Sequence, residues 1–367
     1  MKPSAMTSVS CRHTGRGFTL VELMIAVAIG LFIVAAIGSV FVSSKRSFWA
    51  TNAITSMDDT ARAVFDLMGA SIRQAGFNGC QRMSGAVNGD TRALAYDPAA
   101  GWWTQVGTPV QAYVAPAADG NFAAPVANPV QGTEVLRLIG VDPTREASVI
   151  SDDPDSATIT TGNHSFQNGQ TLLATSCLFN SFFVMSGGTA TTITHTATGG
   201  NCSANLGAAA CDDDSGTGDD AASTLPAGAS ILPVEASVWS VAPSSRAGKG
   251  NSLWMGSTGL QTRPESAATE LINGVENLAF KFGVDTTGDG SSLQWQTTEN
   301  VPDWNLVRAV RVHLLLSTLP DSGASAVGNN ATVRFNGQDY TSSTTPAIDP
   351  RRVYREYSAT FTLRNTM

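Results

Sequence analysis

The chain begins with an uninterrupted apolar run that limits the folds it can adopt. Residues 18–42 read FTLVELMIAVAIGLFIVAAIGSVFV and carry a single charge, Glu22. As an α-helix these 25 residues would be about 37 Å long, which is enough to cross a hydrocarbon core of about 30 Å. Only positive charges precede the run within residues 1–17, and Lys45 and Arg46 follow it. The run therefore predicts a helix in a membrane.

Two simpler explanations of this run are a secretory signal peptide and a plain anchor. A signal peptide has an apolar core of roughly 7–15 residues followed by a small-residue cleavage site, whereas this run is longer and no Ala-x-Ala site follows it. A plain anchor has no need of Glu22 near one end of the run, because a carboxylate at that depth is costly unless it is paired or close to the interface. Glu22 is therefore a candidate functional residue.

The residues around Glu22 resemble a processing site. The string GFTLVE at residues 17–22 is similar to the site at which type IV pilins and related pseudopilins are cut. The resemblance implies that residues 1–17 are a prepilin leader, that a prepilin peptidase cuts after Gly17, and that the new N-terminal residue, Phe18, is N-methylated. It also implies that Glu22, fifth in the mature chain, pairs with the terminal amine of a neighbouring subunit during assembly. In a medium of low dielectric constant such a pair offsets much of the desolvation of the carboxylate.

The helical pattern continues past the apolar run. Residues 43–75 place apolar side chains at steps of three and four with charged residues between them, which indicates one buried face of an α-helix. Gly76 supplies a C-terminal stop. We expect one helix from residue 18 to about residue 75, whose first half (18–42) lies in the membrane or a filament core and whose second half lies against a globular head. The apolar positions are Met57, Ala61, Val64, Phe65, Met68, Ile72 and Ala75.

The remaining residues, 76–367, predict a head made of strands and long loops. Alternating apolar and polar residues indicate half-buried antiparallel strands, most clearly at 270–366. We expect an α+β fold, in which the long N-terminal helix packs on one face of an antiparallel β-sheet head. Segments 85–130 and 186–230, rich in small and turn-forming residues, are expected to be irregular insertions. The candidate strands are Glu134–Ile139, Phe182–Met185, Thr191–His195, Ser237–Val241, Leu278–Val284, Arg308–Leu316 and Val353–Leu363.

Four of the five cysteines belong to the head. Cys11 would be lost with the leader, which leaves Cys80, Cys177, Cys202 and Cys211. Outside the cytoplasm an even number of cysteines would pair as disulfides, here in one of three connectivities. Pairing Cys202 with Cys211, and Cys80 with Cys177, is one of these three. No Cys-x-x-Cys spacing favours a zinc site.

The C-terminal third narrows the resemblance. Three segments together resemble the PilW-type minor pilins: LINGVENLAFKFGVDTTGD at 271–289, VPDWNLVRAVRVHLLLS at 301–317 and RRVYREYSATFTLRN at 351–365. With the N-terminal motif, the likeness covers roughly residues 18–80 and 270–366. The region between them has no clear counterpart and is expected to be particular to this chain.

The PilW resemblance implies a minor pilin that helps to initiate type IV pilus assembly and lies in the pilus or its tip complex. The implied partners are other minor pilins, the major pilin, the prepilin peptidase and the inner-membrane assembly platform. The implied location is the inner membrane, as a single-pass protein with a periplasmic head, and then the extracellular pilus. Two alternatives stay open, namely a J-type pseudopilin of type II secretion and an adhesin-like head that binds a surface.

Charge and motifs argue against other classes of protein. The net charge is −8, and no cluster of Lys and Arg is present that would bind the phosphates of a nucleic acid. The Gly-x-Ser-x-Gly, His-Glu-x-x-His and Walker motifs are absent from the sequence, so we expect no enzyme and assign no catalytic residue.

Two further patterns, an acidic loop and a pair of tryptophans, are weaker indications of binding sites. Asp285 and Asp289 lie at spacings found in calcium loops, but the alternating ligands are incomplete, and an Asp-Gly hairpin turn is the favoured interpretation. We therefore expect no cofactor, with calcium as the alternative. Adjacent Trp102 and Trp103 could form a binding platform, although a position in the core is favoured.

Overall fold

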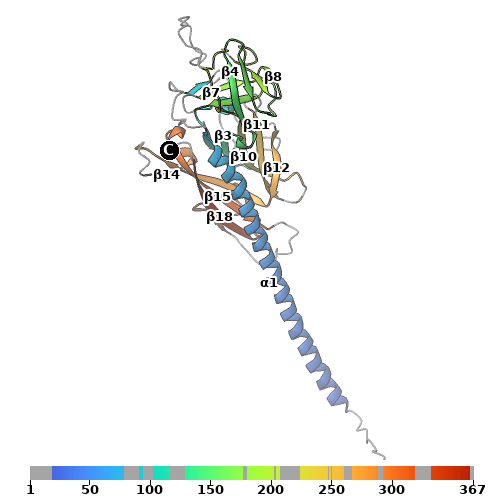
Figure 1. Cartoon of the computed structure of the whole chain (residues 1–367). Helices are drawn as coiled ribbons and strands as arrows, with labels where there is room; N and C mark the ends of the chain where they lie inside the picture. Colours follow the sequence, from blue (N-terminus) through green and yellow to red (C-terminus); the bar gives the residue numbers. More distant parts are fainter. Residues whose placement is uncertain are drawn as a thin grey trace, which may run out of the picture. The chain divides into compact units, whose positions relative to one another are not determined.

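The computed structural model describes residues 19–77, 91–93, 102–115, 129–176, 180–201, 204–206, 224–246, 248, 250–259, 267–287, 292–318 and 332–363. The chain divides into two compact units, Met1–Thr51 and Asn52–Met367. The first unit contains the beginning of the long helix α1 (Leu20–Gln74), and the second contains the rest of this helix and the strands (Figure 1).

In the first unit, α1 is apolar on all sides between Leu23 and Val42. Its large apolar side chains are exposed, including Leu31 at 66% and Phe32 at 77%. Within the described residues, α1 is the one helix long and apolar enough to cross a membrane. A helix that is apolar all round is normally found buried in protein or lipid. This part of α1 therefore requires lipid or the apolar surfaces of other subunits around it.

The C-terminal end of α1 agrees with the sequence prediction. Its last residue is Gln74, and Gly76 adopts a φ of 71°, the left-handed conformation that ends many helices. The predicted helix is therefore confirmed from Leu20 onward, whereas Phe18 lies outside the described residues.

In the second unit, one stripe of α1 is buried. Met57, Ala61, Val64, Met68 and Ile72 are each at most 4% exposed, and they follow one another at steps of three and four residues. They belong to one apolar cluster with residues from two sheets. The apolar face predicted from the sequence is confirmed, and it fixes this half of the helix in the head.

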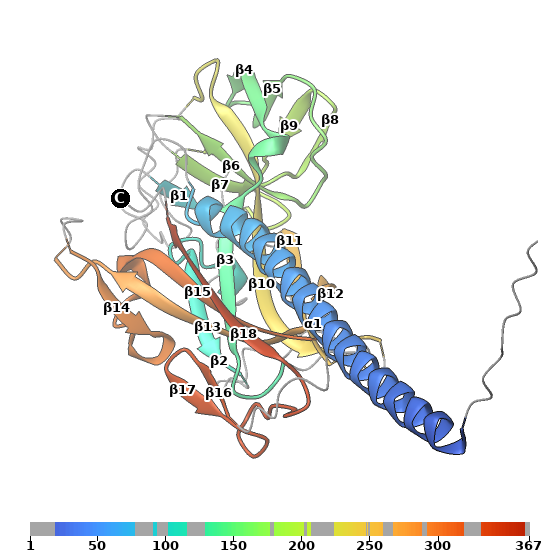
Figure 2. The same ribbon diagram turned by 90° about the horizontal axis from the view of Figure 1, so that it is seen from below.

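A four-stranded antiparallel sheet packs against this stripe. Its strand order is β14-β13-β15-β18 (Figure 2). Phe280, Phe282, Val310, Val312 and Leu314 are completely buried in the same cluster as the helix stripe. The α+β class and the three C-terminal strands predicted from the sequence are therefore confirmed. The bounds are Val275–Val284 for β13, Gln294–Thr297 for β14, Val307–Ser317 for β15 and Tyr354–Thr362 for β18.

A second sheet, of twelve strands, is organised around β10 (Ser230–Pro243). This 14-residue strand pairs with β11 over residues 235–243, with β3 over residues 234–239, and with β4 and β6 at its start. It thereby joins the strands near the helix to a smaller lobe that has its own apolar cluster. The other strands are β1 (Thr91–Ala93), β2 (Val110–Val114), β3 (Glu134–Val141), β4 (Ala147–Asp153), β5 (Thr158–Thr161), β6 (Thr171–Thr175), β7 (Asn180–Val184), β8 (Gly187–Thr189), β9 (Thr192–Thr194), β11 (Asn251–Gly259) and β12 (Thr269–Asn273).

The second sheet corrects the expectation of two irregular insertions. Segment 85–130 contains β1 and β2, and segment 186–230 contains the β8–β9 hairpin and two leucines, Leu206 and Leu225, that are buried in the lobe's core. Strands β1 and β8 have only three residues each, which is too short for an alternating pattern to be visible. The four strands predicted in the middle region are present as β3, β7, β9 and β10. A further hairpin, β16–β17, spans Val333–Phe335 and Gln338–Tyr340.

One carboxylate connects the two sheets. Glu134, the first residue of β3, accepts hydrogen bonds from the backbone N–H of Phe280 on β13 (2.8 Å) and from the Thr298 hydroxyl (2.5 Å). Burial raises the pKa of Glu134 from 4.5 to about 7, because desolvation outweighs both hydrogen bonds. Glu134 is therefore more readily protonated in the folded chain than in the unfolded chain.

We predict that the Glu134 contribution to stability falls as the pH rises from 4.5 to about 7. The folded chain binds this proton more tightly, so the stabilisation is fully present below the unfolded pKa and is lost as the pH passes through the folded pKa. His195 acts with the opposite sign, since burial lowers its pKa to about 4. Comparing the melting temperature of the parent chain with that of Glu134→Gln separates the contribution of Glu134 from that of His195, which is present in both chains.

Over this pH range the Glu134→Gln variant should gain up to about 3 kcal/mol of stability relative to the parent chain. The expected observation is a melting-temperature difference that grows steadily with pH. A difference that stays constant between pH 4.5 and 7 would show that Glu134 does not change its protonation on folding.

Candidate assembly site

The first turn of α1 contains a reciprocal pair of hydrogen bonds between Thr19 and Glu22. The Glu22 Oε2 atom accepts from the backbone N–H of Thr19 (3.1 Å) and from its hydroxyl (3.0 Å). The Thr19 Oγ1 atom in turn accepts from the backbone N–H of Glu22 (3.3 Å). This is a capping box, in which a Thr at the N-cap and a Glu three residues later satisfy each other's free N–H groups.

The capping box gives Glu22 a fixed place at the positive end of the helix dipole. A carboxylate is favoured in the first turn because the free N–H groups of the helix carry partial positive charge. Both hydrogen bonds end on Oε2, and within the described part of the chain Oε1 accepts none. The second oxygen is therefore available to a positive group. Thr19 was not among the predicted site residues, although the Thr-x-x-Glu spacing of residues 19–22 is typical of a capping box.

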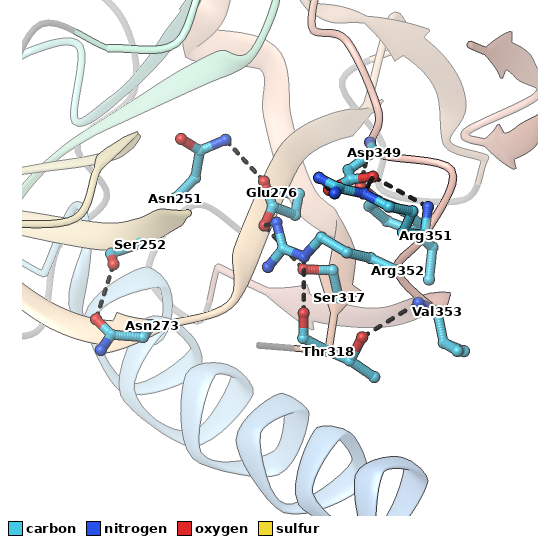
Figure 3. A network of polar contacts seen from close by, with 11 residues as sticks. Asn251, Ser252, Asn273, Glu276, Ser317, Thr318, Asp349, Arg351, Arg352 and Val353 are labelled. Atoms are coloured by element: carbon cyan, nitrogen blue, oxygen red, sulfur yellow. Dashed lines mark hydrogen bonds and ion pairs between the residues drawn. The ribbon is translucent and has the colours of Figure 1, made fainter. Parts of the chain in front are cut away.

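A second polar site lies inside the C-terminal region (Figure 3). Glu276 and Arg352 form a buried ion pair, with 2.5 Å between Oε1 and Nη1. Glu276 also accepts from the Ser317 hydroxyl (2.8 Å) and from the side-chain amide of Asn251 (2.8 Å). Arg352 donates from Nε to the carbonyl oxygen of Thr318 (2.7 Å). The network joins β11, β13 and β15 to the segment that leads into β18.

This network explains a part of the PilW-like pattern in physical terms. Glu276 comes from the segment 271–289, Ser317 from 301–317 and Arg352 from 351–365. The three segments that carry the resemblance therefore meet around one buried ion pair. A buried charge is tolerated only when it is paired and hydrogen-bonded, so these residues depend on one another. Their arrangement is suited to holding the head together.

The two predicted calcium ligands are not brought together by the described residues. Asp285 is buried, accepts a hydrogen bond from the Thr287 hydroxyl (3.1 Å) and lies 4.0 Å from Nε of Arg308. A positive guanidinium at that distance competes with a cation for the carboxylate. Asp289 lies outside the described residues, and no group of three or more metal-ligating side chains is found among those described. Calcium binding therefore stays a prediction.

Of the other predicted site residues, only the tryptophan pair lies among the described residues. Gly17, Phe18 and the four cysteines Cys80, Cys177, Cys202 and Cys211 lie outside the described residues, so cleavage, methylation and disulfide pairing stay predictions. Trp102 is buried, and the guanidinium of Arg137 lies 4.7 Å from its ring centroid and 4.6 Å from that of Tyr113. The core position favoured for Trp102 is confirmed, and Trp103 is partly buried beside it.

Comparisons with known proteins match two parts of the chain. Residues 12–38 match the prokaryotic N-terminal methylation motif, and residues 239–365 match the family described as type IV pilus-assembly protein W. No curated protein matches the chain. Among solved structures, a type IV-like pilin from Thermus thermophilus is 15% identical, with 54% of this chain and 85% of that chain covered and a TM-score of 0.20.

The methylation motif, the exposed apolar helix and the antiparallel head together define a type IV pilin-like protein, anchored in the inner membrane and built to enter a pilus. The match over residues 239–365 is more specific. The chain is therefore a type IV pilin-like protein whose C-terminal part, residues 239–365, is similar to the PilW family.

We predict that Arg352→Gln lowers the stability of the head by about 3–5 kcal/mol, because it leaves the Glu276 charge buried without a partner. The adjacent Arg351 provides a matched control. Its side chain is 80% exposed and pairs with Asp349, so Arg351→Gln should cost no more than about 1 kcal/mol. Thermal unfolding of the full chain in detergent measures both. Equal losses in the two variants would show that the buried pair does not stabilise the head.

Proposed function

We propose that this protein helps to initiate assembly of a type IV pilus and stays in the pilus or its tip complex. The observation that supports this most directly is the contrast along α1. Its first part exposes apolar side chains on every side and begins with the capped carboxylate of Glu22, whereas its second part is fixed in the head. Such a subunit can exchange lipid for the helices of neighbouring subunits without unfolding its head.

The proposed mechanism begins with cleavage after Gly17 by a prepilin peptidase. Cleavage would leave Phe18 with a free amine and keep the N–H and hydroxyl of Thr19 in place for the capping box. Oε1 of Glu22 would then accept a charge-assisted hydrogen bond from the amine of a neighbouring subunit. In an apolar filament core this bond would be strong, because little water competes for either charge. The partners would be other minor pilins, the major pilin and the inner-membrane assembly platform.

In this proposal the protein is a structural subunit and has neither catalytic residues nor a required cofactor. The match to the PilW family over residues 239–365 favours a pilus over type II secretion, because it lies in the head and is separate from the shared N-terminal motif. The adhesin alternative relied on an exposed tryptophan pair, and Trp102 is buried.

We predict that Glu22→Gln reduces the number of surface pili about tenfold or more. A glutamine can still complete a capping box, so the change removes the charge while it keeps the first turn of the helix. Losing one charge-assisted hydrogen bond costs about 1.5–3 kcal/mol, which corresponds to a factor of ten or more. Pili sheared from cells and counted by electron microscopy give the measurement.

Thr19→Ser is the matched control, because serine retains the hydroxyl of the capping box and the Glu22 charge. Pilus number in this variant should equal that of the parent strain. The head of both variants should resist protease as the parent head does. Normal piliation in the Glu22→Gln strain would contradict the proposed function.

A further inference from the structure

The strand β18 is unusual among the edges of the two sheets. It is the last strand of the four-stranded sheet and pairs with β15 on one side only. With nine residues it is much longer than the other edge strands in the described part of the chain, β1, β2, β8, β12 and β14, which have three to five residues each. Proteins commonly shorten their edge strands to prevent pairing with other chains. β18 lacks this protection.

Successive residues of β18 point their backbone N–H and C=O groups alternately toward β15 and away from it. The N–H of Leu363, directly after the strand, donates to the carbonyl oxygen of Arg308. In an antiparallel ladder every second residue faces the same neighbour, so Phe361, Ala359 and Tyr357 also face β15. The N–H and C=O groups of Ser358, Thr360 and Thr362 point outward. No described residue supplies a backbone partner for them.

The side chains along this edge suit an added strand. Residues 357–362 read YSATFT and contain no charge and no proline, and their pairing with β15 has no bulge. On one face, Ser358, Thr360 and Thr362 are exposed. On the other face, Phe361 is half-buried against Phe65 of α1, with 6.3 Å between ring centroids. An added strand with apolar residues on this second face would cover both rings.

The direction of α1 limits which strand can be added. The Tyr357 hydroxyl bonds to Asp58 (2.5 Å), and Phe361 lies beside Arg73, whose guanidinium is 5.7 Å from its ring centroid. In the head, α1 and β18 therefore run in the same direction. Two copies paired antiparallel through β18 would have the head portions of their α1 helices in opposite directions, so their heads could not lie side by side in the same orientation.

The opposite edge of the same sheet shows what would fit. β14 runs antiparallel to β18, as the alternation of the four strands requires. A neighbouring head in the same orientation would therefore present an antiparallel edge strand to β18. The β14 strand of this chain has only four residues, too few to match nine. A second copy is thus a poorer fit than a different subunit with a longer edge strand.

We propose that the edge of β18 from Ser358 to Thr362 binds an extended edge strand from the head of a different pilin-type subunit. The added strand runs antiparallel to β18, places apolar side chains against Phe65 and Phe361, and places polar side chains beside the exposed hydroxyls. The inference rests on the proposed function, because it takes the partner to be another subunit of the same assembly.

The test uses the full-length chain in its own host cell, with the photo-reactive residue p-benzoylphenylalanine in place of Thr362. Illumination should join Thr362 to an edge strand of another pilin-type subunit, identified by mass spectrometry of the joined peptides. Ser358→Pro removes one outward N–H and is compatible with an edge strand, whereas Ser358→Ala keeps the N–H. The yield of the adduct should fall at least tenfold in Ser358→Pro and be unchanged in Ser358→Ala.

Three results would overturn the proposal: an adduct with a second copy of this chain, equal yields in the two variants, or no adduct in cells that assemble pili. If Ser358→Pro lowers the melting temperature, Thr360→Pro takes its place, because it removes the next outward N–H. The subunit and strand joined to the parent chain test the proposal independently of either variant. The Glu22→Gln strain keeps the two proposals apart. Normal piliation there together with a strand adduct would reject the proposed function and keep the edge interaction.

Discussion

One buried stripe of α1 allows this helix to lie both in the head and in lipid or a filament core. The stripe consists of Met57, Ala61, Val64, Met68 and Ile72. Their burial fixes the second half of α1 between the two sheets of the head, so the first half can remain apolar on every side without drawing the head into lipid. Burying five such side chains supplies much of the driving force for docking, at about 25 cal/mol per Å² of apolar area. The same apolar cluster contains residues of both sheets, so the stripe also holds the sheets against the helix.

Three polar side chains of the head join strands that are far apart in the sequence. Glu276 and Arg352 join strands from three separated segments of the chain, and Glu134 joins the two sheets. Glu276 and Arg352 are buried, Glu134 is half-buried, and all three are hydrogen-bonded, so each is costly to remove singly. By contrast Glu22 lies at the exposed start of α1, where its own capping box leaves one oxygen available. The residue proposed to act in assembly is therefore well separated in the sequence from the residues that hold the head together.

Periodicity in the sequence was enough to predict the helix, its buried face and the strongest strands. Met57 to Ile72 repeat at helical spacing over several turns, and the strands near the C-terminus alternate over seven or more residues. Most of the twelve-stranded sheet was not predicted. Gly187–Thr189 has only three residues, and a longer strand such as Asn251–Gly259 does not alternate apolar and polar residues. The ion pair between Glu276 and Arg352 could not be predicted either, because 75 residues separate them and only the folded sheet brings them together.

The central claim is that this subunit acts in pilus assembly, and deletion of its gene tests that most directly. Surface pili with twitching and the export of secreted enzymes would be measured in the same deletion strain, with the parent gene restored as the control. The account predicts that pili are lost while secretion stays normal. Normal pili with lost secretion would contradict it and would assign the protein to the secretion pseudopilins.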